Sequence, residues 1–279
     1  MAAPIPPEVK TVVAFVFIPG AQPGKAVPYG TAFFVGVKDP KNSERSFVYL
    51  VTAKHVLQGS DHKSWLPKIL VRLNTKNGGV ETVEIPVSLT GSNKTVFQHP
   101  DSSVDIAVIP ALPDPNKFDF KILPEDMITT EKDFKDLNIT EGSEVFFTGL
   151  FSPYVGTRRN YPVVRFGRVS LITDEKIKFV DQEAQLYLIE SGSYGGNSGS
   201  PVFFYLGSDR TPGSLILGPP TVKLAGVMSG SFLDLQPVSA VETSQVTVAP
   251  SNMGIAAVVP AYKLHEILFG AELKKQRGQ

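Results

Sequence analysis

Short runs of apolar residues recur along the whole chain, and turn-forming residues end each run. The runs of the first half lie at residues 11–19, 32–37, 47–52, 69–73, 80–86 and 106–109. Those of the second half lie at residues 145–149, 163–172, 186–189, 202–206, 224–228 and 255–259. Runs of this length, rich in β-branched residues and bounded by Gly and Pro, predict strands. Because no helical pattern alternates with them, we expect an antiparallel sandwich or a pair of barrels.

Two segments depart from this strand pattern. Residues 112–142 are rich in Pro, Asp, Glu and Lys, so we interpret them as a connector between two halves, with about one helical turn near residues 131–137. After Pro260, apolar residues follow at helical spacing, which predicts one amphipathic helix over residues 261–273. The residues that carry this spacing are Leu264, Ile267, Leu268 and Ala271.

Composition excludes several classes of function. The 279 residues carry 27 basic and 27 acidic side chains, and a net charge of zero argues against a nucleic-acid partner. The absence of cysteine excludes a disulfide scaffold, a cysteine nucleophile and cysteine-ligated metal, and it fits a reducing compartment. The apolar run at residues 11–19 is far shorter than the ~20 residues of a membrane span. We therefore interpret it as a buried first strand and expect no membrane partner, although a trimmed export signal would leave no trace.

Three short motifs carry residues suited to catalysis. His55 ends the string T-A-K-H after a predicted strand, although alone it is more simply a surface or core histidine. Asp105 precedes an apolar strand, where it is either a turn residue or a buried carboxylate that needs a partner. Ser198 lies in G-G-N-S-G-S-P, and glycines around a serine expose its hydroxyl in a sharp turn. They also free the N–H groups of Gly196 and Ser198 to bind a developing oxyanion, whereas the simplest alternative is an ordinary Gly/Ser turn.

Taken together, the motifs resemble those of the chymotrypsin/trypsin family of serine proteases, in its bacterial, cysteine-free form. Their order is His, Asp, Ser, with spacings of 50 and 93 residues, and the resemblance covers about residues 12–268. It implies that Ser198 is the nucleophile, His55 the general base and Asp105 the carboxylate that orients the histidine. It further implies that the N–H groups of Gly196 and Ser198 form the oxyanion hole.

The same resemblance implies a fold and an activity. We expect an all-β protein of two six-stranded antiparallel Greek-key barrels with a C-terminal helix, forming a single protease domain over residues 1–279. The first barrel would span about residues 12–111, the connector 112–142, the second barrel 143–260 and the helix 261–273. The activity would be that of a serine endopeptidase, acting on proteins or peptides through an acyl-enzyme without a cofactor. The alternative is an inactive pseudo-protease that serves as a binding module; a regulatory partner is not identifiable. We expect a cytoplasmic bacterial protein, with a secreted form as the alternative.

A set of small residues resembles the family's primary specificity pocket. The predicted substrate-binding residues are Gly192, Ser193, Ser229, Gly230, Ser231 and Gly254. Gly192 would form an uncharged floor, so we expect no selection of Lys or Arg before the cut bond, and a preference for apolar or aromatic residues. Glu190 is close to Gly192 in sequence, and its negative charge is the main feature that argues against this expected specificity.

Some positions depart from the family pattern. Asn197 replaces the aspartate that pairs with a newly cut amino terminus in activated members, so we expect activity without an activation cut. Residues 207–220 form an insertion of unknown role. An α/β-hydrolase is excluded because Ser200 stands where its nucleophile motif needs glycine. No metal site is expected, because His62, His99 and His265 lack ligand spacing.

Overall fold

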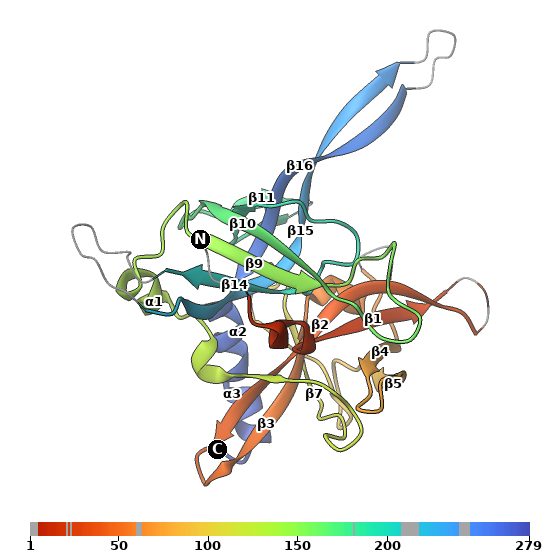
Figure 1. Cartoon of the computed structure of the whole chain (residues 1–279), viewed down its shortest axis with the longest axis vertical. Coiled ribbons are helices and arrows are strands. Elements are labelled where there is room, and N and C mark those ends of the chain that lie inside the picture. The colour runs from red at the N-terminus through yellow and green to blue at the C-terminus, as the bar shows by residue number, and fades with distance from the viewer. Residues whose placement is uncertain are drawn as a thin grey trace.

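The chain forms two β units that lie against each other (Figure 1). The structure is a computed structural model that describes residues 5–20, 22, 24–59, 63–180, 182–207, 218–239 and 246–279, with backbone alone for 234–239 and 246–251. Most of the insertion at residues 207–220, and His62, lie outside the described residues.

The first unit is an eight-stranded sheet in the order β5-β4-β1-β2-β3-β7-β6, with β8 pairing β2 in parallel. Its strands are β1 (Val13–Pro19), β2 (Ala26–Asp39), β3 (Asn42–Thr52), β4 (Lys68–Asn74), β5 (Val80–Pro86), β6 (Phe97–Gln98), β7 (Ala107–Pro110) and β8 (Ile122–Pro124). Within the run at residues 11–19, Val13–Pro19 forms the strand β1, buried along its first four residues, and Thr11 ends a preceding 3₁₀ helix, Pro7–Thr11. The described pairings leave this sheet open, with β5 and β6 at its edges, where we had expected a six-stranded barrel.

The second unit is a closed six-stranded antiparallel barrel in the order β10-β13-β16-β15-β14-β9. Its strands are β9 (Glu144–Gly149), β10 (Val163–Leu171), β13 (Tyr187–Glu190), β14 (Pro201–Leu206), β15 (Thr221–Ser239) and β16 (Val246–Pro260). A small hairpin of β11 (Ile177–Phe179) and β12 (Gln182–Ala184) accompanies it. Strands β15 and β16 run much further than the predicted segments 224–228 and 255–259 and project beyond the barrel (Figure 1).

Among the described residues, the α-helices lie in the connector and at the C-terminus. The connector holds a 3₁₀ helix, Glu125–Met127, and α1 (Glu131–Asp136), where a helical turn was expected. The predicted helix over 261–273 is instead two helices, α2 (Ala261–Leu268) and α3 (Ala271–Gln276). The break falls at Gly270, whose backbone is extended (φ −70°, ψ 161°), and glycine is a poor helix former.

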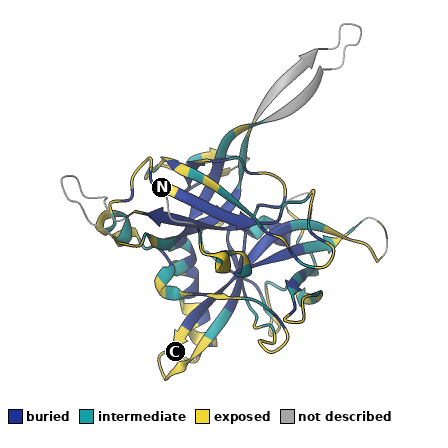
Figure 2. Cartoon of the chain, viewed as in Figure 1, coloured by how far each residue is buried: buried dark blue, intermediate teal, exposed yellow. Residues whose placement is uncertain are grey.

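One hydrophobic core joins the two units. Phe33 of β2 belongs to the same buried cluster as Phe146 of β9 and Phe203 of β14. Leu264 and Ile267 of α2 join this cluster, so the C-terminal helix closes over the shared core. Figure 2 shows that the buried residues follow the strands where the units meet. A shared core of this kind fixes one unit against the other, and the catalytic candidates lie along that junction.

Candidate active site

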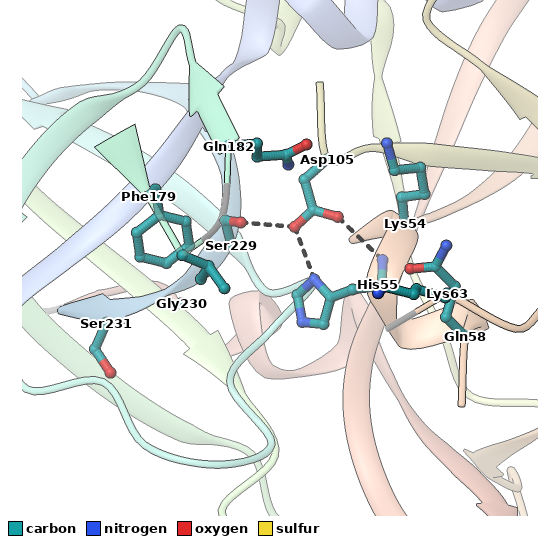
Figure 3. Close-up of a pocket in the computed structure, with 11 residues that line it drawn as sticks. Lys54, His55, Gln58, Lys63, Asp105, Phe179, Gln182, Ser229, Gly230 and Ser231 are labelled. Atoms are coloured by element: carbon teal, nitrogen blue, oxygen red, sulfur yellow. Dashed lines mark hydrogen bonds and ion pairs between the residues drawn. The ribbon is translucent and has the colours of Figure 1, made fainter. Parts of the chain in front are cut away.

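His55 and Asp105 form a close pair beside the junction. His55 lies in a 3₁₀ helix, Lys54–Leu57, that begins just after β3 ends, and Asp105 lies shortly before β7. Asp105 Oδ2 lies 2.7 Å from His55 Nδ1, and Asp105 Oδ1 accepts a hydrogen bond from the His55 backbone N–H at 3.0 Å (Figure 3). Two contacts from one carboxylate fix both the ring and the backbone of His55, and they favour the tautomer with the proton on Nδ1. That tautomer leaves Nε2 able to accept a proton.

The mutual electrostatic interaction of His55 and Asp105 favours the charged form of each side chain. Burial by itself would lower the pKa of His55, but the charge and hydrogen bond of Asp105 outweigh burial and raise that pKa above its usual 6.5. Burial by itself would raise the pKa of Asp105, but His55 and the hydroxyl of Ser229 outweigh it and lower that pKa. Ser229 Oγ donates to Asp105 Oδ2 at 2.6 Å. Asp105 therefore stays ionised and stabilises a protonated His55.

Ser198 lies in a turn packed against the end of β3. A Cβ at Gly199 (φ +83°) would come within 2.1 Å of the Thr31 carbonyl oxygen and 3.0 Å of the Ala53 nitrogen, so only glycine fits this approach. The turn therefore lies against Ala53, where the chain passes from β3 into the 3₁₀ helix that contains His55. Ser198 Oγ donates to the carbonyl oxygen of Ser229 at 3.2 Å. Ser229 thus contacts both Ser198 and Asp105, and the three predicted catalytic residues come together around it.

The two backbone N–H groups that are predicted to form the oxyanion hole are available to bind an oxyanion. Within the described part of the chain, the N–H groups of Gly196 and Ser198 donate no hydrogen bond. Asn197 between them is 1% exposed and holds the turn with neutral bonds. Its Nδ2 donates to the Leu150 carbonyl at 2.8 Å, and its Oδ1 accepts from the Tyr194 N–H at 2.9 Å.

The predicted substrate-binding residues fall into two groups. Ser229, Gly230 and Ser231 line a cavity of about 550 Å³ that His55 and Lys54 also border (Figure 3). A cavity directly beside the imidazole is placed to take a side chain of a bound peptide.

The second group surrounds Asn252. Asn252 Nδ2 donates to the carbonyl of Ser193, and its Oδ1 accepts from the Gly254 N–H at 2.8 Å. The Ser191 N–H donates to the Gly254 carbonyl at 2.8 Å, so Gly192 lies within this bonded group. Sequence reasoning missed Asn252 because the segment between the two predicted strands carried no recognisable motif.

The charges near the predicted pocket differ from expectation. Glu190 is exposed and lines a different cavity, with Ile5 and Phe166, so it does not charge the pocket floor. Arg165 of β10 does approach that floor, because its Nη1 would lie 3.7 Å from a Cβ at Gly192. No motif drew attention to Arg165, since a lone arginine in a strand is usually solvated.

The described residues include neither a cluster of metal ligands nor a helix able to span a membrane. Among them, no group of three or more His, Asp or Glu residues is arranged to hold a metal ion. In the same part of the chain, no helix combines the length and apolar character needed to cross a membrane.

Comparison with known proteins identifies the fold. No protein-family model matches the sequence, and no curated protein matches it. The protease domain of MamO from Magnetospirillum magneticum superposes with a TM-score of 0.53 at 18% identity, covering 93% of this chain and 97% of that one. The human heparin binding protein superposes with a TM-score of 0.50 at 10% identity, covering 96% and 94%. The chain has a chymotrypsin-like fold. The all-β class and the fold expected from the motifs are confirmed, while identities this low leave activity to the site itself.

Proposed function

We propose that the chain is a serine endopeptidase with a chymotrypsin-like fold. The observation that carries the proposal is the bonded cluster around Ser229, which gathers Ser198, His55 and Asp105 from separate motifs. A serine on a glycine-rich turn, a histidine held by a buried carboxylate and two open backbone amides supply each group that acyl transfer requires. The substrates would be proteins or peptides.

Each residue has a distinct role in the proposed reaction. The Ser198 hydroxyl turns from the Ser229 carbonyl to His55, gives its proton to Nε2, and its oxygen bonds to the carbonyl carbon of the substrate. The amides of Gly196 and Ser198 stabilise the resulting oxyanion. His55 then protonates the leaving amine as the peptide C–N bond breaks, and water hydrolyses the acyl-enzyme by the reverse sequence. Asp105 stabilises the imidazolium throughout.

One observation favours the alternative of an inactive binding module. The Ser198 hydroxyl donates its proton to the Ser229 carbonyl, and a proton held there is not the one that the base must accept. If that arrangement persisted with a peptide bound, the chain would bind peptides without cutting them.

A serine-directed probe separates the two functions. The full chain, shown by intact mass to be uncut, should react with a fluorophosphonate and hydrolyse an unstructured protein such as casein. Ser198→Ala should abolish labelling and lower turnover by on the order of 10⁵ to 10⁶. Thr11→Val, at a hydroxyl far from the catalytic turn in sequence, is the matched control. An uncut wild-type chain that binds peptides but neither labels nor cuts would establish the alternative.

A further inference from the structure

The peptide between Gly195 and Gly196 carries one of the two predicted oxyanion donors. Glycine on both sides removes the Cβ atoms that normally restrict a peptide plane, so this plane is intrinsically free to rotate. Gly196 has φ +96°, a region that other residues rarely occupy. Rotation of the plane would turn the Gly196 N–H away from the oxyanion and point a carbonyl oxygen there instead. The turn therefore needs an external restraint.

Ser152 supplies a direct restraint on this peptide. Its Oγ donates to the carbonyl oxygen of Gly195 at 2.7 Å. In a planar trans peptide the C=O and N–H bonds point in opposite directions. The bond from Ser152 thus directs the Gly196 N–H away from Ser152. A Cβ at Gly196 would lie 2.6 Å from Ser152 Oγ, so a larger residue at position 196 would displace this hydroxyl.

The next peptide is held in a similar way from another part of the chain. Thr31 Oγ1 donates to the Gly196 carbonyl at 2.8 Å, and the Asn197 N–H donates to the Tyr194 carbonyl at 3.0 Å. Consecutive carbonyls of the turn are therefore held by two hydroxyls, both neutral. The Gly195–Gly196 plane differs from its neighbour because the Ser152 bond is the only hydrogen bond to it within the described part of the chain.

We propose that Ser152 is a positioning residue that holds the Gly195–Gly196 peptide with the Gly196 N–H facing the oxyanion. This role rests on the proposed function. Ser152 contacts no reacting atom and acts through the Gly195 carbonyl. Because its hydroxyl does not titrate, the oxyanion donor is held equally well at acid and neutral pH.

Two variants and a control test this role in the full chain. Ser152→Ala removes the bond, and Ser152→Thr keeps a hydroxyl at the same position. Thr11→Val is the control, because Thr11 Oγ1 also donates one 2.7 Å bond to a backbone carbonyl, that of Glu8. We expect Ser152→Ala to lower kcat/KM by about 3- to 10-fold, as the loss of one neutral hydrogen bond predicts. This is less than the 10²–10³-fold cost of deleting an oxyanion donor.

The readouts distinguish positioning from general destabilisation. A reversible peptide aldehyde, which forms an oxyanion-like adduct on Ser198, should lose affinity by the same factor as kcat/KM. The KM and the pH midpoint of the reaction should not change, and Ser152→Thr should recover most of the loss. Equal inhibitor affinity in Ser152→Ala and wild type would overturn the role.

A crystal structure of Ser152→Ala tests the same idea without relying on activity. We expect the Gly195–Gly196 plane to rotate or to occupy two orientations, while Thr11→Val keeps the wild-type plane. A wild-type chain without any hydrolysis or labelling would defeat the proposed function but not this structural result. An unchanged plane in Ser152→Ala would defeat the positioning role whatever the activity.

Discussion

Thr31 Oγ1 donates a 2.8 Å hydrogen bond to the carbonyl oxygen of Gly196, joining β2 of the first sheet to the turn of the second barrel that carries Ser198. Thr31 Oγ1 also accepts a hydrogen bond from the Leu150 N–H at 2.9 Å. The Thr31 backbone N–H donates to the Ser198 carbonyl at 2.8 Å, and its carbonyl accepts from Thr52 Oγ1 at 2.7 Å. One fully buried residue therefore ties the serine turn to the strand that leads into His55.

Replacing Thr31 should test how much this connection stabilises the protein. Thr31→Val keeps the shape of the side chain but leaves the Leu150 N–H and the Gly196 carbonyl without their partner in a buried site. We expect the free energy of unfolding to fall by about 1–3 kcal/mol. Thr31→Ser, which keeps the hydroxyl, should lose much less. Urea denaturation of both variants measures this, and equal stability of Thr31→Val and wild type would contradict it.

The pH dependence of hydrolysis should reflect the Asp105–His55 pair. Because Asp105 raises the pKa of His55 above 6.5, the rate should reach half its maximum above pH 6.5 and plateau at higher pH. In Asp105→Asn the charge is lost while burial and the nearby Lys54 still lower that pKa, so the midpoint should move below 6.5. The plateau should also fall by about 10⁴, because the histidine tautomer is no longer fixed. A kcat/KM profile that is flat between about pH 5 and 8 would refute the role of His55.

The fold was predictable where local patterns and tertiary contacts agree. Strand β1 is an apolar run that is buried along its first four residues, so its pattern is clear in the sequence. The outer parts of β15 and β16 were not predicted, because they extend beyond the barrel and carry Pro237 and Pro250, which usually interrupt strands. The C-terminal helix was placed correctly, but apolar spacing continued through Gly270 and hid the break between α2 and α3.

The site was predictable only where residues fall within motifs. His55, Asp105 and Ser198 each lie in a recognisable string. In the structure His55 bonds Asp105, and Ser198 bonds Ser229, which also bonds Asp105; that the three act together in catalysis stays a prediction. Ser152 and Thr31 act through single hydroxyls on backbone carbonyls far away in sequence. Such bonds depend on tertiary geometry, and an isolated Ser or Thr gives no sign of its partner. Their roles therefore appear only once the two units are packed together.

Asn197 should be required as a neutral amide. In Asn197→Asp, an ionised carboxylate would have no donor for the buried Leu150 carbonyl and would face its oxygen instead. Burial without a cation raises the folded-state pKa of that carboxyl above its unfolded value of about 3.9. The protonated acid is thus the better-tolerated form, so stability relative to wild type should be greatest below about pH 4 and fall as pH rises through the folded-state pKa.

Unfolding measurements at several pH values test the direction of this pH dependence. We expect Asn197→Asp to lose about 1–3 kcal/mol or more at pH 7 and less at pH 4, each relative to wild type at the same pH. A deficit that is the same at both pH values would show that the carboxylate has found a partner. A variant activated by a newly cut amino terminus would show that the neutral turn is not needed.

Arg165 should make the predicted pocket reject basic side chains. Its guanidinium lies over the ring of Tyr194, 4.6 Å from the centroid, and its Nη1 would be 3.7 Å from a Cβ at Gly192. Within the described residues it has no anionic partner, and its buried Nε has no hydrogen bond. A Lys or Arg of the substrate at Gly192 would therefore meet a positive charge that no carboxylate of the described residues pairs with.

A peptide library cut by the full chain tests this expectation. We predict that peptides with Lys or Arg before the cut bond are cleaved at least about 10-fold more slowly than those with apolar residues, as desolvation and like-charge repulsion both oppose them. In Arg165→Leu the difference between the two cleavage rates should become smaller, because the like-charge repulsion is removed and only the cost of desolvation remains. Arg168→Leu is the matched control, since Arg168 lies on the same strand but pairs with Glu144, 3.5 Å away. Strong selection of Lys or Arg by the wild-type chain would show that the substrate side chain enters elsewhere, and an unchanged ratio in Arg165→Leu would show that Arg165 does not face it.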